Sequence, residues 1–286
     1  MTATVTEFTT RFVDAGGVRT RYLEAGEGEP VVLLHGSGPG VTAEANWTAT
    51  IPGLAGRYRV IAPEMIGFGA TEREPELRYR IRTWVNHVIA FLDALELPRA
   101  NLVGNSLGGI VSIFTALEHR ERVRRMVLMG APGVGMTMTE GLRALRAYEP
   151  SLDGMRDLLR QYFAHDPALV TEDLVLRRYQ ASAEPGEQEN YRAIHAGQSA
   201  RDNPMLSPDL VRTLSTPTLL VHGRDDRVLS AEISWKMANL LPNADLHLFH
   251  DCGHWAQIEH RDEFNRLVGD FFADSDTQGA RTKEEP

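Results

Sequence analysis

The sequence predicts an α/β protein with a mostly parallel, twisted β-sheet flanked by helices and a helical insertion over one end. Short, continuous apolar runs alternate along the chain with segments of helical periodicity. Such runs are typical of parallel strands that are buried on both faces. The chain has 286 residues, enough for one sizeable domain with an insertion or for two small domains.

The strands and helices expected in the core follow one another in a regular order. Seven stretches have the composition of strands, namely residues 20–26, 30–36, 58–64, 100–105, 123–133, 217–226 and 244–254. Helices are expected over residues 83–97, 107–120 and 262–273. The first and last of these place apolar side chains on one face: Val85, Val88, Ile89, Leu92 and Leu95, and Phe264, Leu267, Val268 and Phe271.

Residues 134–212 interrupt the alternation of strands and helices. They contain "TEGLRALRAYEP", "GMRDLLRQYFA" and "TEDLVLRRYQASA", which predict short helices with polar connectors. We therefore expect an α/β core made of residues 1–133 and 213–274, and a helical lid over residues 134–212. The polar residues 275–286 are expected to form a disordered tail.

Composition limits the classes of partner. The formal net charge is −9, nearly all positive charge is arginine, and no basic block occurs, which argues against nucleic acid. The single cysteine, Cys252, excludes an internal disulfide bond. No signal peptide is recognisable, and no apolar run approaches the roughly 18 residues of a membrane helix. We expect a cytoplasmic protein that does not bind membranes.

Ser106 lies in the stretch "LVGNSLGGIV", where Gly104-Asn105-Ser106-Leu107-Gly108 joins an expected strand to an expected helix. Such a sharp turn strains its central residue, exposes the serine hydroxyl, and directs the next backbone N–H, that of Leu107, toward the site. The alternative is a glycine-rich turn with a solvent-exposed serine. The flanking strand and helix favour a nucleophile.

A serine nucleophile needs a base and an acid that orients it. Asp225 and Asp226 follow one expected strand and His254 follows the next, so the chain order is serine, acid, histidine. Asp226 is favoured over Asp225 because it lies further from the strand end, where the loop can turn toward the imidazole. Alternatively, the acids form a polar turn and His254 is a buried loop residue.

Two other patterns have competing explanations. The loop in "LLHGSGPG" offers the Ser37 N–H as a second oxyanion donor beside that of Leu107. As a nucleotide-binding loop it is weak, because Pro39 lacks an N–H and no acidic residue ends a following strand at the expected distance. The group His247, His250, Cys252 and His254 resembles metal ligands by count, but strand alternation directs its side chains apart, so we expect no metal site.

Taken together, "HGSGPGVTAEANW", "GNSLGG", "GRDDRV" and "CGHWAQIEH" resemble the meta-cleavage-product hydrolases. These are α/β-hydrolases of bacterial aromatic degradation that cut a carbon–carbon bond, and the resemblance runs over about residues 17–272. It implies the α/β-hydrolase fold, 2-hydroxy-6-oxo-hexa-2,4-dienoate substrates, and 2-hydroxypentadienoate and a carboxylic acid as products. The lid run "TEGLRALRAYEPSLDGMRDLL" looks closest to members that act on ring-fission products of monocyclic aromatics. The resemblance also implies no metal or organic cofactor and assembly into a homo-oligomer, a dimer or higher.

The resemblance further implies substrate contacts. Arg178 matches the lid arginine of the family, and its planar guanidinium suits a carboxylate, although Arg177 is a neighbour that could be mistaken for it. The remaining matched substrate contacts are Gly38, Asn46, Asn105 and Trp255. Two other functions stay open: a carboxylesterase or lactonase on the same scaffold, and a non-catalytic protein that binds small molecules.

Overall fold

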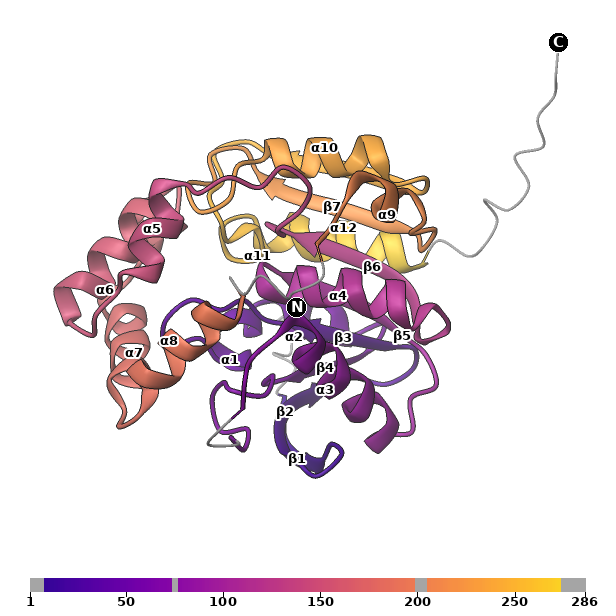
Figure 1. The fold of residues 1–286 in the computed structure, drawn as a ribbon, viewed down its shortest axis with the longest axis horizontal. Coiled ribbons are helices and arrows are strands. Elements are labelled where there is room, and N and C mark those ends of the chain that lie inside the picture. Colours follow the sequence, from indigo (N-terminus) through magenta and orange to yellow (C-terminus); the bar gives the residue numbers. More distant parts are fainter. Residues whose placement is uncertain (1–7, 74–76, 199–204, 274–286) are drawn as a thin grey trace, which may run out of the picture.

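The predicted α/β architecture is confirmed by a computed structural model, which describes residues 8–73, 77–198 and 205–273. Figure 1 shows a central sheet covered by helices on both faces. Its strand order is β1-β2-β4-β3-β5-β6-β7-β8. β2 is antiparallel to β1 and β4, and the other neighbouring pairs are parallel. The strands are β1 (Thr9–Asp14), β2 (Arg19–Ala25), β3 (Pro30–Leu34), β4 (Arg59–Pro63), β5 (Ala100–Asn105), β6 (Val123–Met129), β7 (Thr218–Gly223) and β8 (Ala244–Phe249).

Successive residues of a strand point to opposite faces of the sheet, so the continuous apolar strands build two cores. On β3, Val32 and Leu34 face a core that includes α3 and α4, whereas Val31 and Leu33 face a core under α1, α2 and α12. The core helices are α1 (Ala43–Trp47), α2 (Thr50–Ala55), α3 (Ile81–Ala94), α4 (Leu107–Glu118), α10 (Glu232–Leu240), α11 (Ala256–Glu259) and α12 (Arg261–Ala273), with the 3₁₀ turn η1 (Arg120–Arg122).

β1 has no counterpart among the expected strands. It pairs only with β2 and is almost entirely exposed, so it lacks the apolar pattern that identifies a buried strand. The guanidinium of Arg19 covers the ring of Phe12 at 3.8 Å from its centroid, which shields the largest apolar side chain of the edge. An exposed edge strand of this kind is held by its backbone pairing rather than by burial.

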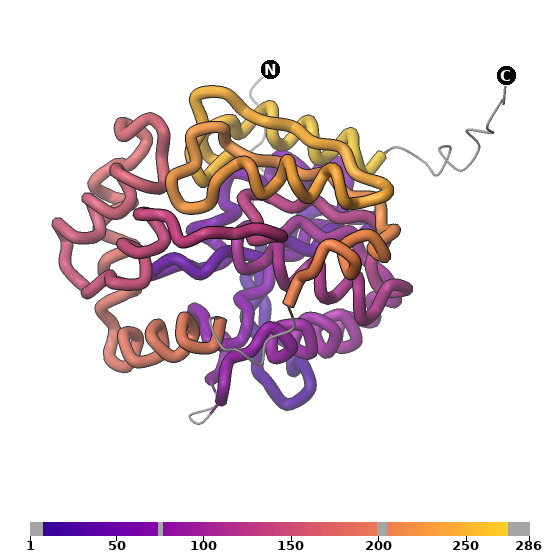
Figure 2. The backbone as a smooth tube through the Cα atoms, turned by 45° about the horizontal axis from the view of Figure 1, so that its top comes forward, coloured from indigo at the N-terminus to yellow at the C-terminus, as the bar shows by residue number. Residues whose placement is uncertain are grey.

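The helical insertion stands at one end of the sheet, as Figures 1 and 2 show. It contains α5 (Glu140–Arg146), α6 (Leu152–Leu158), the π-helical turn η2 (Leu159–Phe163), the 3₁₀ turn η3 (Pro167–Leu169), α7 (Glu172–Ala183) and α8 (Glu187–Gln198). The short helix α9 (Pro208–Arg212) instead packs against α10 of the core. We propose that the lid ends between α8 and α9, earlier than residue 212. The expected tail, 275–286, lies outside the described residues, as does residue 274.

Within residues 8–73, 77–198 and 205–273, no helix combines the length and apolarity that crossing a bilayer requires.

Two buried histidines are held in the neutral state by their hydrogen bonds. His35 Nε2 accepts from the Met65 N–H at 3.1 Å, and His87 Nδ1 accepts from the Ile66 N–H at 3.2 Å. The opposite ring nitrogens lie 2.7 Å from the Gly36 carbonyl and 2.8 Å from a threonine hydroxyl. A protonated ring would lose its accepting nitrogen. Burial lowers the pKa of both His35 and His87 to about 4.

Acidification is therefore expected to destabilise the fold before most carboxylates titrate. As pH falls below about 6.5, these two histidines become protonated in the unfolded chain. In the native protein they stay neutral until about pH 4. Each histidine then removes up to about 1.4 kcal/mol of unfolding free energy per pH unit. Urea unfolding at several pH values should show a shallower dependence for His87→Gln than for the wild type. His250→Gln, at an exposed site, is the matched control. An unchanged slope in His87→Gln would contradict the assignment.

Candidate active site

Ser106 occupies a strained turn between β5 and α4. Its φ of 50° and ψ of −111° lie where side chains other than glycine are rarely found, and its N–H donates to the Met129 carbonyl at 3.0 Å. A Cβ on Gly104 would lie 2.3 Å from the Gly108 carbonyl oxygen. A Cβ on Gly108 would lie 2.1 Å from the carbonyl oxygen of Leu34. The two glycines therefore let the strand and helix backbones approach closely enough to hold Ser106 at the turn.

Gly108→Ala is expected to destabilise the protein by roughly 2–4 kcal/mol, because the clash is with backbone that cannot move aside. Thermal unfolding followed by circular dichroism measures the loss. Gly56→Ala is the matched control, since Gly56 has a φ of −70° and nothing lies within 4 Å of a Cβ there. A Gly108→Ala protein as stable as Gly56→Ala would show that the close approach is not required.

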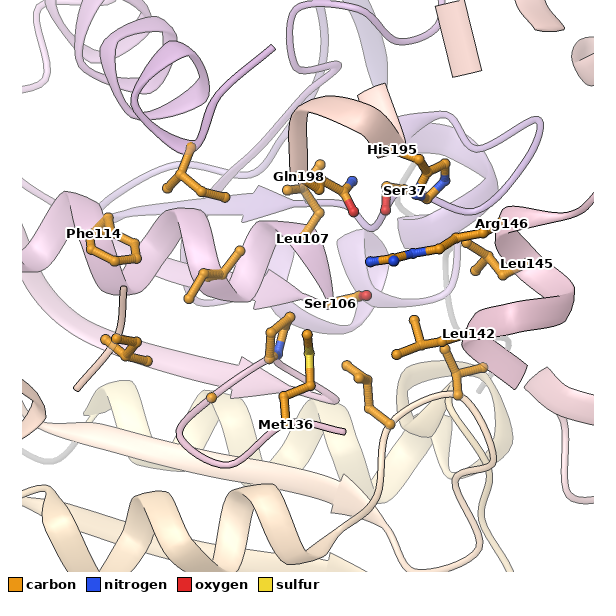
Figure 3. Close-up of a pocket in the computed structure, with 17 residues that line it drawn as sticks. Ser37, Ser106, Leu107, Phe114, Met136, Leu142, Leu145, Arg146, His195 and Gln198 are labelled. Atoms are coloured by element: carbon orange, nitrogen blue, oxygen red, sulfur yellow. The ribbon is translucent and has the colours of Figure 1, made fainter. Parts of the chain in front are cut away.

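His254 and Asp226 form a buried pair on the loops that follow β8 and β7. His254 Nδ1 lies 2.7 Å from Asp226 Oδ2, and the His254 N–H donates to the Phe163 carbonyl at 2.7 Å. Phe163 ends the π-helical turn η2, so the lid itself anchors the histidine backbone. Figure 3 shows Ser106 at the cavity edge; no hydrogen bond joins its hydroxyl to His254 within the described part of the chain. Catalytic hydrogen bonds are often long in the absence of substrate.

Asp226 is surrounded by donors. Its Oδ1 accepts the N–H groups of Val228 and Leu229 at 2.8 and 2.9 Å, while Oδ2 faces His254 and also His222 Nε2 at 3.1 Å. His222 Nε2 also lies 2.9 Å from the Leu229 carbonyl, so this nitrogen carries the proton. Burial raises the pKa of Asp226, but the electrostatic attraction of His254 and the hydrogen bonds from the two histidines outweigh it and hold that pKa below its ordinary value.

His222 is not among the site residues predicted from the sequence, although it directly precedes the "GRDD" motif. Its ring is fully buried, and Nδ1 lies 2.7 Å from the Ser234 hydroxyl. The other acid of the motif, Asp225, faces His165 at 3.3 Å near the surface instead of His254. The structure thus places Asp226, the favoured carboxylate, against the imidazole, and it adds a second histidine behind that carboxylate.

A cavity of about 200 Å³ opens at Ser106 (Figure 3). Ser37 and Leu107 both line it, as the serine does. Leu107 is the first residue of α4, so its N–H has no acceptor within the helix and is available to a ligand. The two expected oxyanion donors therefore belong to residues that border the same cavity as the hydroxyl.

Arg178 is almost completely buried, with 3% of its surface exposed. Its guanidinium lies 5.8 Å above the Trp255 ring and beside Gly38, where an added Cβ would come within 3.0 Å of it. Nε has no hydrogen-bond partner, and no ion pair to Arg178 occurs among the described residues. Burial lowers the pKa of Arg178 to about 10, so the charge persists at neutral pH. Arg177 is exposed and pairs with Asp173 at 2.6 Å.

The remaining predicted contacts are also buried. Asn105 donates from Nδ2 to the Met129 carbonyl at 3.3 Å, which braces the turn. Asn46 Nδ2 is buried without a hydrogen-bond partner, and the backbone carbonyl of Asn46 accepts from Gln257 Nε2 at 3.3 Å. An unsatisfied buried amide is costly unless a ligand completes it. Asn46 is therefore consistent with a ligand contact, whereas Asn105 serves the turn itself.

The histidines and cysteine near the C-terminus do not converge. His250 contacts Asp251 at the surface, His254 contacts Asp226, and Cys252 is buried. Among the described residues, three possible ligand atoms approach one another within 4.8 Å only at His165, Asp225 and Asp251. That group is partly exposed and includes none of the four, although His250 contacts its Asp251 at the surface.

Comparison with known proteins places this geometry in a family. Residues 29–261 match the family model of the alpha/beta hydrolase fold. A 2-hydroxy-6-oxo-2,4-heptadienoate hydrolase from Pseudomonas putida strain F1 is 47% identical over 268 residues, which cover 93% of this chain and 97% of the relative. The chain belongs to the meta-cleavage product hydrolases. A 2-hydroxymuconate semialdehyde hydrolase from Pseudomonas sp. strain CF600 is 46% identical to this hydrolase, with 93% of the chain and 94% of the relative covered.

Solved structures agree with the assignment of this hydrolase. The meta-cleavage product hydrolase CumD from Pseudomonas fluorescens IP01, solved as a serine-to-alanine mutant with acetates, superposes with a TM-score of 0.87 at 47% identity. The match covers 92% of this chain and 97% of that structure. The carboxylesterase CesB from Bacillus subtilis, at 19% identity and a TM-score of 0.81, shares the fold alone. The predicted fold, family and enzyme class are therefore confirmed.

Proposed function

We propose that this hydrolase cleaves the carbon–carbon bond next to the C6 carbonyl of 2-hydroxy-6-oxo-hexa-2,4-dienoates from monocyclic aromatic degradation. The products are 2-hydroxypentadienoate and a carboxylic acid. The observation that carries the proposal is Arg178, a buried and unpaired guanidinium in a protein of net charge −9. A dienoate has a carboxylate that would neutralise it, whereas simple ester hydrolysis needs no such cation.

Binding of the substrate carboxylate is assigned to Arg178. The guanidinium lies over Trp255 and beside Gly38, so the carboxylate would meet it next to an aromatic face and close to the backbone. Gly38 follows the oxyanion residue Ser37, which connects the two parts of the site through adjacent residues. Asn46 supplies a buried amide without a partner for a further polar group of the dienoate.

His254 is assigned the proton transfers. A carbon leaving group is expelled only as a stabilised enolate, so the dienol must first become the keto tautomer. The imidazole takes the proton of the 2-hydroxyl and guides protonation of the carbon chain. The pair with Asp226 at 2.7 Å keeps the Nδ1 proton on the side of the carboxylate and leaves Nε2 to act as the base.

Ser106 is assigned the attack on the C6 carbonyl. The resulting oxyanion is held by the Leu107 N–H, at the start of α4, and by the Ser37 N–H, which belongs to another residue of the same cavity lining. Loss of the enolate then breaks the carbon–carbon bond, and water releases the acid. The triad consists of Ser106, His254 and Asp226, and no step calls on a metal or organic cofactor.

A spectrophotometric screen tests the proposal. Purified protein is mixed with the yellow ring-fission products of catechol, 3-methylcatechol and 2,3-dihydroxybiphenyl, and bleaching is recorded beside hydrolysis of p-nitrophenyl acetate. Rapid bleaching of the first two products supports the proposal. Ester hydrolysis with no bleaching of any ring-fission product would replace it with a carboxylesterase or lactonase.

Two further proposals follow from the family. Copies of the chain assemble into a dimer or a higher homo-oligomer, which light scattering of the purified protein measures. The site of action is the cytoplasm, where ring-fission products arise, and fractionation of cells that express the chain checks it.

A further inference from the structure

A second arginine reaches into the cavity at Ser106, and the proposed mechanism leaves it without a role. Arg146 is the last residue of α5, and its guanidinium extends across the cavity toward Ser106 and Ser37 (Figure 3). Its Nε is fully buried without a hydrogen-bond partner. In the described part of the chain, no hydrogen bond or ion pair to Arg146 is present. The side chain is therefore placed by packing and not by an internal anion.

Arg143, in the last turn of the same helix, serves as a comparison for Arg146. Basic side chains in a last helical turn are favoured by the helix dipole and are usually solvated. Arg143 is solvated in this way: it is exposed, and it donates to the carbonyl of Met138, which precedes α5, at 3.0 Å. Arg146, three residues later, turns inward toward Ser106. Solvation thus accounts for the direction of Arg143 but not for that of Arg146.

The cavity supplies no counter-ion to Arg146. None of the described residues that line it is aspartate or glutamate, and the walls are mainly apolar, with Ile110, Phe114, Leu142 and Val228 among them. Arg146 is half-buried, and the part of its charge that faces this apolar cavity without an anion costs free energy that a bound anion would recover.

His195 adds no charge to the cavity lining. Burial lowers its pKa to about 4, and the positive charge of Arg146 acts in the same direction. The imidazole is therefore neutral at physiological pH, and the described residues of the lining carry one uncompensated positive charge, that of Arg146. Arg178 does not line this cavity; it faces Gly38 and Trp255 instead.

Resting on the proposed function, we propose that Arg146 binds a carboxylate on the C6 substituent, so that the preferred substrates are dioates with a short acidic side chain. Arg178 takes the carboxylate of the dienoate, and Arg146 takes the carboxylate at the other end, on the acyl side of Ser106. The apolar walls contact the methylene groups between the C6 carbonyl and that second carboxylate. The acid released is then a short dicarboxylic acid.

Three ring-fission substrates test this assignment, with methyl, 2-carboxyethyl or 3-methylbutyl as the C6 substituent. The last two have nearly the same shape and differ in charge. We expect the wild type to turn over the carboxyethyl substrate with a kcat/KM at least ~10-fold above that of the 3-methylbutyl substrate. Arg146→Met should abolish or reverse this ratio, Arg146→Lys should keep part of it, and Arg143→Met should leave it unchanged.

A binding measurement separates this inference from the proposed function. Succinate should raise the Tm of the wild type and of Arg143→Met by more than that of Arg146→Met, in which only Arg178 remains to bind a carboxylate, whether or not any substrate is bleached. If the methyl and 3-methylbutyl substrates are bleached without preference for carboxyethyl, Arg146 has no such role and the proposed function stands. If no ring-fission substrate is bleached, the proposed function fails and the substrate assignment of Arg146 fails with it.

Discussion

Replacing Ser106 with alanine is expected to lower kcat for dienoate hydrolysis by roughly 10⁴-fold or more, because the nucleophile of the triad is lost. The fold should be unaffected. The Ser106 hydroxyl has no hydrogen bond in the described part of the chain, and the turn is held by its backbone N–H to Met129. Stopped-flow recording of bleaching measures the loss, and thermal unfolding checks the fold. Residual hydrolysis within tenfold of the wild type would mean that His254 activates water without Ser106.

Asp226→Asn is expected to lower both activity and stability, so it tests the triad less specifically than Ser106→Ala does. Each contact to the carboxylate comes from a donor: Val228 N–H and Leu229 N–H on one oxygen, His254 and His222 on the other. An amide has one oxygen, so its NH₂ group must face donors on one side. Loss of activity would then be accompanied by about 1–3 kcal/mol of lost stability.

Arg178→Met is expected to separate the two candidate reactions. We expect kcat/KM for a ring-fission product to fall by roughly 10²–10³-fold, since a buried charge-assisted contact to the substrate carboxylate is lost. Hydrolysis of p-nitrophenyl acetate, which has no carboxylate, should stay within about threefold. The same variant should unfold at an equal or higher temperature, because an unpaired buried charge is removed without loss of an internal partner.

Arg177→Met is the matched control for this variant. Arg177 lies on the same helix, is exposed and pairs with Asp173, so its loss should change neither reaction. If Arg178→Met lowers ester and dienoate hydrolysis equally, Arg178 supports the shape of the site and does not bind the substrate carboxylate.

Particular residues show where prediction from the sequence succeeded. The strand, the glycines and the helix around Ser106 are contiguous, so local backbone geometry was enough to predict the turn. The order of Asp226 and His254 on successive loops predicted a shared edge of the sheet, and the structure brings them to 2.7 Å. The buried apolar strands were predictable from their composition, whereas β1 was not predicted because it is an exposed edge strand.

Other residues could not be found from the pattern of the chain. His222 contacts Asp226 from within a strand, where its position resembles an ordinary core histidine. Arg146 and Arg143 are equally polar members of one helix, and only docking of that helix decides which one enters the cavity. Arg178 was chosen over Arg177 on family resemblance alone.

The sequence by itself determined the sheet, the strained turn at Ser106 and the order of the groups proposed as a triad. Each depends on backbone sterics or burial patterns that neighbouring residues specify. Only the tertiary structure decided which charged side chains face the interior of the protein, because that depends on how the lid helices pack on the core. Arg178 and Arg146 are each one arginine among many in the sequence. Neither has a counter-ion among the described residues, and the substrate chemistry proposed here depends on those two unpaired charges.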